Sequence, residues 1–354
     1  MSEPSDLHER ATGWRNWTGD QSCTPAARER PRSIEQLQVA LAGAGERGLR
    51  VRAVGSGHSF SDIACTDGVQ LSLDGLADVL DVDSTSGLVR VQGGITIDAL
   101  NRRLDEHGLA MENLGDIDVQ SIAGAISTGT HGTGARLANI SSQVAELKLV
   151  LADGSTLLCS AEREPDVFRA ARVGLGAVGV IAEVTLRCVP AFTLCGIDAP
   201  APLEQTLTRF EQLALGNDHF EFFVFPYAEM ALTRTNNRTD EPPRPRGQVA
   251  AWANDVLLTN HAFGLLCRVG RRLPGAIPQI NRLVTRLAGR SERVERSASI
   301  FASPRLVRFT EMEYALPREH GPEALRRVLD LIRSKPVEVF FPIEFRVVAA
   351  DDAL

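Results

Sequence analysis

The sequence predicts an α+β protein whose helices and strands form two successive units. Its 354 residues, of which 44% are hydrophobic and 23% charged, are too many for one small domain and enough for two. Segments with a helical spacing of apolar residues alternate with β-branched runs and glycine-containing turns. Prolines and small residues gather at 190–202, so we expect one unit over 1–190 and another over 191–354.

The first expected elements lie in residues 1–75. Ser33 is a typical helix N-cap, apolar residues follow it at helical spacing, and Gly48 ends the pattern. The expected helix covers 33–48, and the expected strands cover 49–54 and 69–73. The loop after the first strand reads Gly55-Ser56-Gly57-His58-Ser59, and together these elements indicate a small α/β unit.

Residues 76–190 are predicted to form a second, mostly β part of the first unit. Asp153-Gly154 is a strong hairpin signal between two β-branched runs. Thr96 and Gly108 are typical of the two ends of a helix. The expected strands are 79–82, 88–92, 144–151, 155–159 and 178–189, and the expected helix is 96–108.

Beyond the proline-rich segment we expect a second α+β unit. Its expected elements are helices near 203–215 and at 322–334, strands at 220–225 and 337–348, and a polar loop at 239–247. Residues 268–308 contain ten arginines and only two glutamates, and they are predicted to be largely helical. This stretch is either a solvated helix face, which the prolines at 274 and 278 favour, or a surface attracted to an anionic lipid or a partner.

Charge and cysteine content exclude several classes of protein. Lys and Arg total 38 against 45 Asp and Glu, and a net charge of −7 is unsuitable for a dedicated nucleic-acid binder. The polar N-terminus does not look like a signal peptide, and the most apolar stretch, 249–269, carries too many polar residues for a transmembrane helix. Six scattered cysteines suggest buried thiols in a reducing compartment, without disulfides or a metal site. We therefore expect a cytoplasmic protein.

Three glycine-rich segments indicate a large cofactor. The loop at 55–59 follows a strand, and its backbone N–H groups could surround a pyrophosphate. It lacks the Rossmann pattern, because Phe60 stands where the third glycine would be and no helix is expected after it. The segments 121–134 and 175–181 are also rich in glycine and small residues, which suit contact between the backbone and a planar ligand. Each segment alone could be a tight turn, but the three together favour a cofactor.

His58 stands out among the polar residues of these segments. A histidine in a turn most often satisfies a local hydrogen bond. However, an imidazole between a pyrophosphate-type loop and a strand is also placed where it could react with a bound cofactor.

The segment from 54 to 68 resembles the flavin-attachment segment of the aldonolactone and alditol oxidases, which are flavoproteins of the vanillyl-alcohol-oxidase type. The likeness continues at 108–115, 127–131, 166–173 and 342–346, and it is strongest with the L-gulono-1,4-lactone oxidases. It implies a two-subdomain FAD-binding domain over 1–190, with subdomains at about 1–75 and 76–190. An α+β cap domain with an antiparallel sheet would follow over 191–354 and bind the substrate.

The resemblance also implies roles for individual residues. His58 matches the histidine bonded to the 8α-methyl group of FAD, and Glu344 and Arg346 match a catalytic pair on a cap strand. Residues at i and i+2 point to the same side of a strand, so both side chains can face one pocket. The residues implied to contact FAD are Ala53, Val54, Gly55, Ser56, Gly57, His58, Ser59, Gly115, Asp116, Ser121, Gly124, Thr128, Gly129, Thr130, His131 and Ile181.

The implied reaction is FAD-dependent oxidation of a sugar-1,4-lactone, with O2 as acceptor and hydrogen peroxide as product. O2 is favoured because Gly115 has no side chain that would block the approach of O2 to the flavin. The alternative explanation for a glycine at this position is a turn with a positive φ. The alternative functions are an alditol oxidase, an aldonolactone dehydrogenase with another acceptor, or an inactive flavin-binding protein.

Family members continue beyond the point that matches residue 354, through a motif that contains a lysine, whereas the only lysines here are Lys148 and Lys335. We therefore expect a C-terminally truncated chain.

Overall fold

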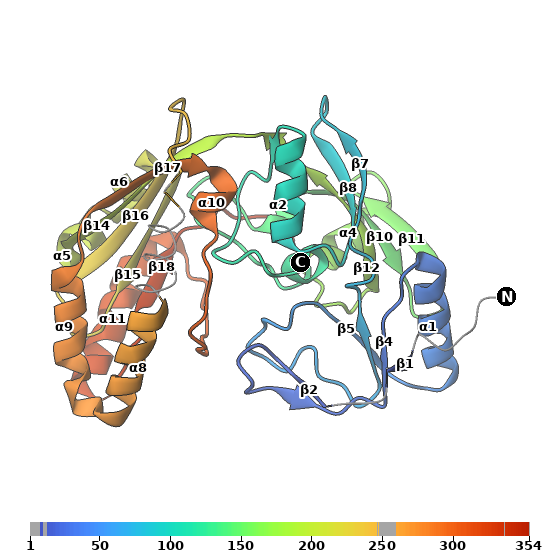
Figure 1. Cartoon of the computed structure of the whole chain (residues 1–354), viewed down its shortest axis with the longest axis horizontal. Coiled ribbons are helices and arrows are strands. Elements are labelled where there is room, and N and C mark those ends of the chain that lie inside the picture. The colour runs from blue at the N-terminus through green and yellow to red at the C-terminus, as the bar shows by residue number, and fades with distance from the viewer. Residues whose placement is uncertain (1–7, 10–12, 246, 248–259, 336, 354) are drawn as a thin grey trace.

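The computed structural model describes residues 8–9, 13–245, 247, 260–335 and 337–353. Two halves lie side by side in Figure 1: an N-terminal half, up to residue 190, and a C-terminal half, from residue 193 onwards. Each half has its own sheets and helices, as expected from the sequence. Among the helices of the described ranges, none combines the length and the hydropathy needed to span a bilayer.

The first sheet of the N-terminal half has the strand order β1-β4-β6-β5, in which β4 and β5 run parallel to β6. Its strands are β1 (His8–Glu9), β4 (Ala27–Glu29), β5 (Val51–Val54) and β6 (Val69–Ser72). The predicted helix is confirmed as α1 (Ile34–Glu46): the Ser33 hydroxyl accepts a hydrogen bond from the Gln36 N–H at 3.2 Å, and Gly48 follows with a φ of +63°. Leu37 and Leu41 of α1 pack in one core with Leu71 of β6.

The second sheet is antiparallel, with the order β11-β10-β12-β8-β7. Its strands are β7 (Val79–Asp83), β8 (Leu88–Gln92), β10 (Val144–Val150), β11 (Thr156–Ser160) and β12 (Val180–Arg187). One face buries its apolar residues against α2 (Ile97–Glu106), α3 (Ile122–Ser127) and α4 (Pro165–Arg172). The predicted hairpin turn and the Thr96 cap of α2 are present. Two short pairs complete this half: β2 (Trp14–Arg15) with β3 (Ser22–Cys23), and β9 (Leu109–Ala110) with β13 (Val189–Pro190).

The C-terminal half contains a third sheet, antiparallel, with the order β17-β14-β16-β15-β18. Its strands are β14 (Thr193–Pro202), β15 (His219–Val224), β16 (Met230–Thr239), β17 (Ser291–Arg296) and β18 (Ile343–Arg346). No strand was predicted within 190–202, but most of this segment forms β14 inside the sheet. Pro200 and Pro202 are tolerated because β17 pairs only with Thr193–Asp198, so β14 is an edge strand beyond that point.

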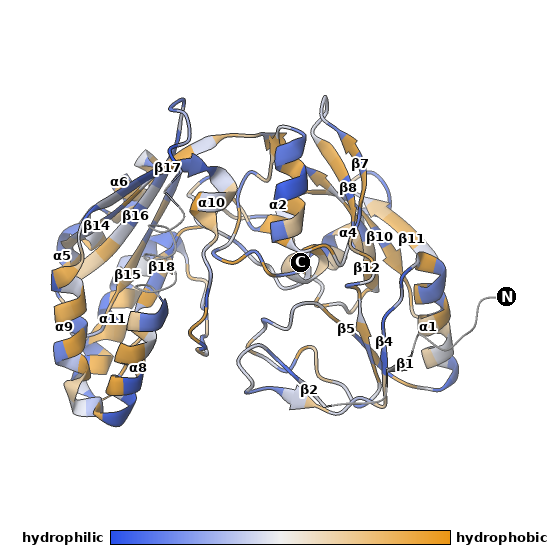
Figure 2. Cartoon of the chain, viewed as in Figure 1, coloured by the Kyte–Doolittle hydropathy of each residue, from blue (hydrophilic) through white to orange (hydrophobic). Residues whose placement is uncertain are grey.

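Helices lie on both faces of the third sheet. On one face are α5 (Leu203–Thr208), α6 (Phe210–Gly216) and α11 (Gly321–Ser334), and the pair α8 (Phe263–Arg272) and α9 (Ile277–Leu287) packs at the end of the sheet, whereas α10 (Ser297–Phe301) lies on the other face, towards the N-terminal half. Phe220 and Phe222 pack towards α5, α6 and α11, while the alternating residue Glu221 points to the opposite face. Figure 2 shows the apolar residues of the sheets and helices gathered where these elements meet.

Two expectations for this half are corrected. The arginine-rich stretch 268–308 is not one helical segment, since it contains β17, which pairs with β14 along six residues. The strand expected at 337–348 is reduced to β18 at 343–346.

Candidate active site

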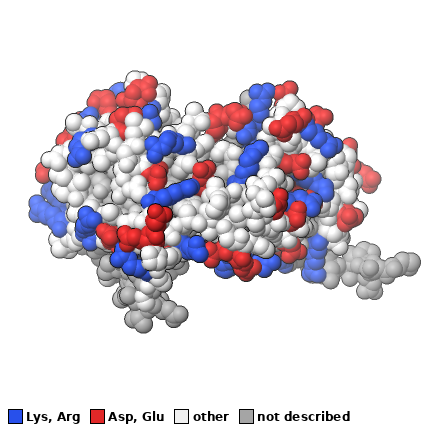
Figure 3. Space-filling view, turned by 90° about the horizontal axis from the view of Figure 1, so that it is seen from above, with Lys and Arg blue, Asp and Glu red and all other residues white. Residues whose placement is uncertain are grey.

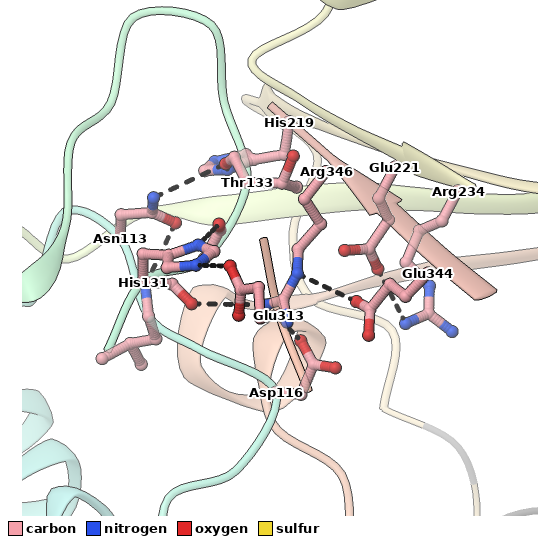
Figure 4. Close-up of polar contacts among 12 residues, drawn as sticks. Asn113, Asp116, His131, Thr133, His219, Glu221, Arg234, Glu313, Glu344 and Arg346 are labelled. Atoms are coloured by element: carbon pink, nitrogen blue, oxygen red, sulfur yellow. Dashed lines mark hydrogen bonds and ion pairs between the residues drawn. The ribbon is translucent and has the colours of Figure 1, made fainter. Parts of the chain in front are cut away.

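The two halves meet where residues 113–134 of the N-terminal half contact the polar face of the third sheet. The Thr133 hydroxyl donates to the Phe220 carbonyl at 2.6 Å, and the Gly134 N–H donates to the Val347 carbonyl at 2.7 Å. The His219 ring also hydrogen-bonds to the Thr133 carbonyl, at 2.8 Å (Figure 4). These backbone contacts fix β15 and the end of β18 against the N-terminal half.

On the N-terminal side, the loop at 55–59 has the close backbone packing expected of a cofactor cradle. It follows β5, whose last two residues are Ala53 and Val54. A Cβ at Gly55 would lie 2.3 Å from the Ser121 hydroxyl oxygen, and Gly57 has a φ of +69°. The Ser56 hydroxyl donates to the Val119 carbonyl, and the Ser59 carbonyl accepts from the Asn16 amide at 3.1 Å. The loop therefore lies directly against the start of α3.

His58 lies in this loop with its ring stacked on Trp17, at 4.9 Å between ring centroids. Its side chain is partly exposed. Burial lowers the pKa of His58. This favours the neutral imidazole, which has a free lone pair on one ring nitrogen.

The second glycine-rich segment begins with α3 rather than with an extended run. Ser121 caps α3 by accepting from the Gly124 N–H at 3.3 Å, and the Thr128 hydroxyl donates back to the Gly124 carbonyl at 3.0 Å. Gly129 follows with a φ of +68°, which turns the chain towards Thr130. These contacts bring Ser121, Gly124 and the residues 128–131 together, next to the loop at 55–59.

Three other residues implied to contact FAD lie around this segment. A Cβ at Gly115 would come 3.2 Å from the Thr130 methyl carbon, and Asp116 follows it towards the C-terminal half. Ile181 lies on β12 beside the Ala123 turn of α3, in the core of the second sheet. The structure therefore gathers all the predicted FAD-contacting residues around α3 and the loop at 55–59, with Ile181 behind α3 in the core.

On the C-terminal side, charged residues form a row across four neighbouring strands. In the strand register, Asp198 of β14 faces Arg234 of β16, Arg234 faces Glu221 of β15, and Glu221 faces Arg346 of β18. Arg234 lies 2.7 Å from Asp198 and 3.2 Å from Glu221, measured between nitrogen and carboxylate oxygen. We call these four residues the charged row.

Glu344 and Arg346 lie at the end of the charged row and share one side of β18, as predicted. Their closest nitrogen and oxygen atoms are 3.1 Å apart, and the Glu344 oxygen accepts no well-aligned hydrogen bond. Arg346 also donates to the His131 carbonyl at 3.3 Å and lies 3.7 Å from the Asp116 carboxylate. Arg346 of the predicted catalytic pair therefore contacts the predicted FAD-binding segments directly, and Glu344 lies beside it (Figure 4).

Three carboxylates meet at this point. Oxygens of Asp116, Glu221 and Glu344 lie within 4.8 Å of one another, and a cavity of only about 10 Å³ remains beside Asp116, Glu221 and Arg234. Burial raises the pKa of Glu344 to about 8 and that of Glu221 to about 6. Burial acts in the same direction on Asp116, but Arg346 and Arg305 hold the pKa of Asp116 below its usual value. The cluster can thus hold a proton on Glu344 near neutral pH.

Several residues of the site were not predicted from the sequence. Arg234 and Glu221 belong to the charged row, and the segment 302–317 adds Arg305, which lies 3.1 Å from Asp116. In the same segment, a carboxylate oxygen of Glu313 lies 2.5 Å from a ring nitrogen of His131. Burial of His131 lowers its pKa, but the contact with Glu313 outweighs this effect and raises the pKa. Phe309 packs edge-on against Trp17, the residue stacked on His58. Glu221 had a local signal, its alternation with phenylalanines in β15, but the segment 302–317 lies outside the strands and carried no such signal.

Comparisons with known proteins identify the family of the chain. The family model of an FAD binding domain matches residues 25–160, and that of D-arabinono-1,4-lactone oxidase matches residues 184–354. The L-gulono-1,4-lactone dehydrogenase of Mycobacterium tuberculosis is 51% identical over 342 residues, which cover 96% of this chain and 78% of the relative. The L-gulonolactone oxidase of Bos taurus is 35% identical over 344 residues, with the same two coverages of 96% and 78%.

Solved structures show the same fold. A cholesterol oxidase variant from Brevibacterium sterolicum superposes with a TM-score of 0.77 at 15% identity, over 97% of this chain and 73% of that one. At this low identity the likeness is evidence for the fold alone, and the fold is of the vanillyl-alcohol-oxidase type. The chain therefore belongs to the aldonolactone oxidase and dehydrogenase family, whose members are FAD-linked oxidoreductases acting on lactones.

Proposed function

We propose that the protein oxidises a sugar-1,4-lactone of the L-gulono-1,4-lactone type at a CH–OH group. The observation that carries this proposal is the contact of Arg346, which also pairs with Glu344, with Asp116 and His131, because it joins a charged substrate face to the FAD-binding segments. The names of the relatives support the lactone as substrate. We assign residues 1–190 to FAD binding and 191–354 to a substrate-binding cap domain.

The residues around α3 fit FAD as cofactor. At Gly55 a Cβ would collide with Ser121, and Gly57 and Gly129 have positive φ values, so these positions favour glycine and their backbone carries no side chain that could cover it. The loop 55–59, Ser121, Gly124 and the residues 128–131 would hold the cofactor. Bound FAD would supply the two-electron redox chemistry.

The side chains of the chain itself would bind and orient the lactone. Neighbouring carboxylates raise the pKa of Arg346, so it stays positively charged and can stabilise negative charge that develops in the transition state. Glu344, with its raised pKa, would hydrogen-bond the substrate hydroxyls and position the carbon to be oxidised. The cavity of about 10 Å³ beside Asp116, Glu221 and Arg234 is too small for a sugar lactone, so a lactone could occupy it only if these side chains moved apart.

We infer that FAD is bound covalently through a ring nitrogen of His58. The support is its neutral imidazole in the loop 55–59 and the match of this loop to the family's attachment segment. The test is acid precipitation of the purified protein followed by peptide mapping. Flavin mass on the peptide that contains His58 would support the inference, and acid-stable flavin in His58→Ala would refute it.

The electron acceptor separates two candidate functions. O2, reduced to hydrogen peroxide, follows from the sequence argument on Gly115. A dehydrogenase that uses another acceptor is favoured by the name of the 51% identical relative. The packing of Gly115 weakens the argument for O2. A Cβ there would point at Thr130 and His131, so close packing explains the glycine without any role for O2.

One experiment tests the reaction and the acceptor. Purified protein with measured flavin content is mixed with L-gulono-1,4-lactone, first without O2 and then in air or with an artificial dye. Bleaching of the flavin absorbance by the lactone is expected, and its absence in flavin-loaded protein would contradict the lactone proposal. Peroxide release in air identifies an oxidase, whereas reoxidation by the dye alone identifies a dehydrogenase.

The six free cysteines fit the cytoplasmic location that we propose.

A further inference from the structure

The helices α8 and α9 form an antiparallel pair at the far end of the C-terminal half, away from the candidate active site (Figure 1). A short 3-10 turn, Pro274–Ala276, joins them. Close packing fixes the pair, since a Cβ at Gly270 would lie 3.3 Å from the Ile277 side chain and from Phe340. We call residues 263–290 the basic hairpin.

The basic hairpin carries positive charge only. Its sequence contains six arginines and no aspartate or glutamate, although the whole chain has a net charge of −7. Elsewhere charges of both signs lie intermixed, as on the face shown in Figure 3. The hairpin is therefore a local exception to the charge pattern of the protein.

The structure divides the arginine-rich stretch 268–308 into two parts. Beyond the hairpin, arginines pair with acidic residues: Arg296 with Asp105 and Arg305 with Asp116. Within the hairpin only Arg290 has such a partner, Glu292. Among the described residues, the other five make no ion pair, and all are exposed: Arg268, Arg271, Arg272, Arg282 and Arg286.

Exposed leucines lie among these arginines. Leu265 is 57% exposed, Leu273 60%, Leu283 56% and Leu287 75%. On α9 the buried residues Asn281 and Thr285 face the sheet, so helical periodicity places Arg282, Leu283 and Arg286 on the outer face. Figure 2 shows this mixture of apolar and polar residues on both helices.

We propose that the basic hairpin binds an anionic lipid surface. Arginines would contact lipid phosphates, and the leucines between them would enter the boundary of the acyl chains, which is how amphipathic basic helices lie on membranes. A nucleic acid would use the arginines but offer nothing to the leucines. A second copy of this acidic chain is the other occupant, and the test below distinguishes it. The candidate active site stays open, because the hairpin lies at the opposite end of the C-terminal half.

The experiment is flotation of the purified flavin-loaded 354-residue protein with vesicles. One set contains phosphatidylcholine with about 30% phosphatidylglycerol, and the other contains phosphatidylcholine alone. Binding to the anionic set only, and its loss at high salt, is the expected result. Equal binding to both sets, or no binding, would overturn the proposal.

Variants identify the surface that binds. Each arginine near an anionic surface strengthens binding about fivefold, so the triple variant Arg271→Gln, Arg272→Gln, Arg286→Gln should bind about 100-fold more weakly. The double variant Leu283→Ser, Leu287→Ser should lose roughly tenfold. The matched control is Arg30→Gln, Arg50→Gln, Arg102→Gln, which changes the net charge equally on the N-terminal half and should keep vesicle binding.

Flavin content and lactone turnover verify that each variant is folded. If the control weakens binding as much as the hairpin variant, the attraction is a property of net charge and the proposal fails. Concentration-dependent self-association that Leu283→Ser, Leu287→Ser abolishes, without any vesicle binding, would show that a second copy covers the hairpin instead.

Discussion

The two sides of the candidate active site are built in different ways. On the FAD side, the loop 55–59 and the segment 121–131 act mainly through backbone, glycines and short hydroxyl side chains. On the substrate side, the charged row takes one long charged residue from each of four strands. The FAD side therefore depends on short stretches of sequence, whereas the substrate side depends on the register of the third sheet.

This difference predicts how each side responds to substitution. A charged residue in the row has several partners on other strands, so removing it leaves another buried charge without compensation. A glycine in the FAD side has no partner to lose, and its replacement acts through steric contact and, where φ is positive, through backbone strain. Substitutions in the charged row should therefore have the larger effects.

The largest expected effect is on catalysis at the end of the charged row. Arg346→Ala should slow flavin reduction by the lactone about 10²–10³-fold, which corresponds to about 2.7–4 kcal/mol, because it removes a preorganised positive charge. Stopped-flow absorbance without O2 measures this rate. Arg346→Lys should recover part of it, and a rate within a few-fold of wild type in Arg346→Ala would show that the role assigned to Arg346 is wrong.

A smaller effect, on stability, is expected in the middle of the row. Arg234→Met leaves Glu221, whose side chain is only 5% exposed, without its arginine. Since the Arg234 side chain is 26% exposed, we expect a loss near the lower limit for a broken buried pair, about 3 kcal/mol in the free energy of unfolding. Urea denaturation measures it.

A surface pair is the control for this substitution. Arg30 lies 2.6 Å from Asp74, and both side chains are about half exposed, so Arg30→Met should cost less than about 1 kcal/mol. Adding Glu221→Gln to Arg234→Met should restore part of the lost stability. Equal losses for the two single arginine variants would mean that the charged row is no different from a surface pair.

The sequence predicted the FAD side better than the substrate side for a physical reason. Glycines, N-caps and hydroxyl residues determine local backbone geometry, so the loop 55–59 and the cap of α1 could be predicted from a few neighbouring residues. The charged row joins Asp198, Arg234 and Glu221 through strand register, which depends on pairing between distant segments. The segment 190–202 was predicted to be a boundary because of its prolines, and the sequence did not show that the sheet has an open edge there.

Protonation of Glu344, in the cluster with Asp116 and Glu221, should make the stability of the protein depend on pH. Glu344 has its pKa raised from 4.5 to about 8 by burial, so between these pH values the folded protein binds more protons than the unfolded chain. Stability should therefore fall as the pH rises through this range and level off above it. Glu344→Gln should flatten this fall in urea denaturation at a series of pH values, whereas the exposed Glu323→Gln should not. An unchanged profile in Glu344→Gln would show that Glu344 is ionised throughout.

The smallest effect is expected on the FAD side, at Gly115. This glycine is not among the residues with positive φ, so the alternative explanation that it serves a left-handed turn is wrong. A Cβ at Gly115 would lie 3.2 Å from the Thr130 methyl carbon and 3.3 Å from the His131 carbonyl oxygen. Neighbours must therefore move by a few tenths of an ångström, and Gly115→Ala should cost about 1 kcal/mol of stability.

A second substitution separates packing at Gly115 from control of O2 access. Thr130→Ser removes the methyl group that the new Cβ would meet and keeps the hydroxyl, which accepts from the Gln120 amide at 3.1 Å. If Gly115 serves packing, the double variant Gly115→Ala, Thr130→Ser should regain stability and reoxidise its flavin as the wild type does. If Gly115 instead leaves room for O2, stability should recover while reoxidation by O2 stays slow and reduction by the lactone stays unchanged. Reoxidation that is slow in the wild type as well, together with fast reoxidation by a dye, would remove the O2 explanation and identify a dehydrogenase.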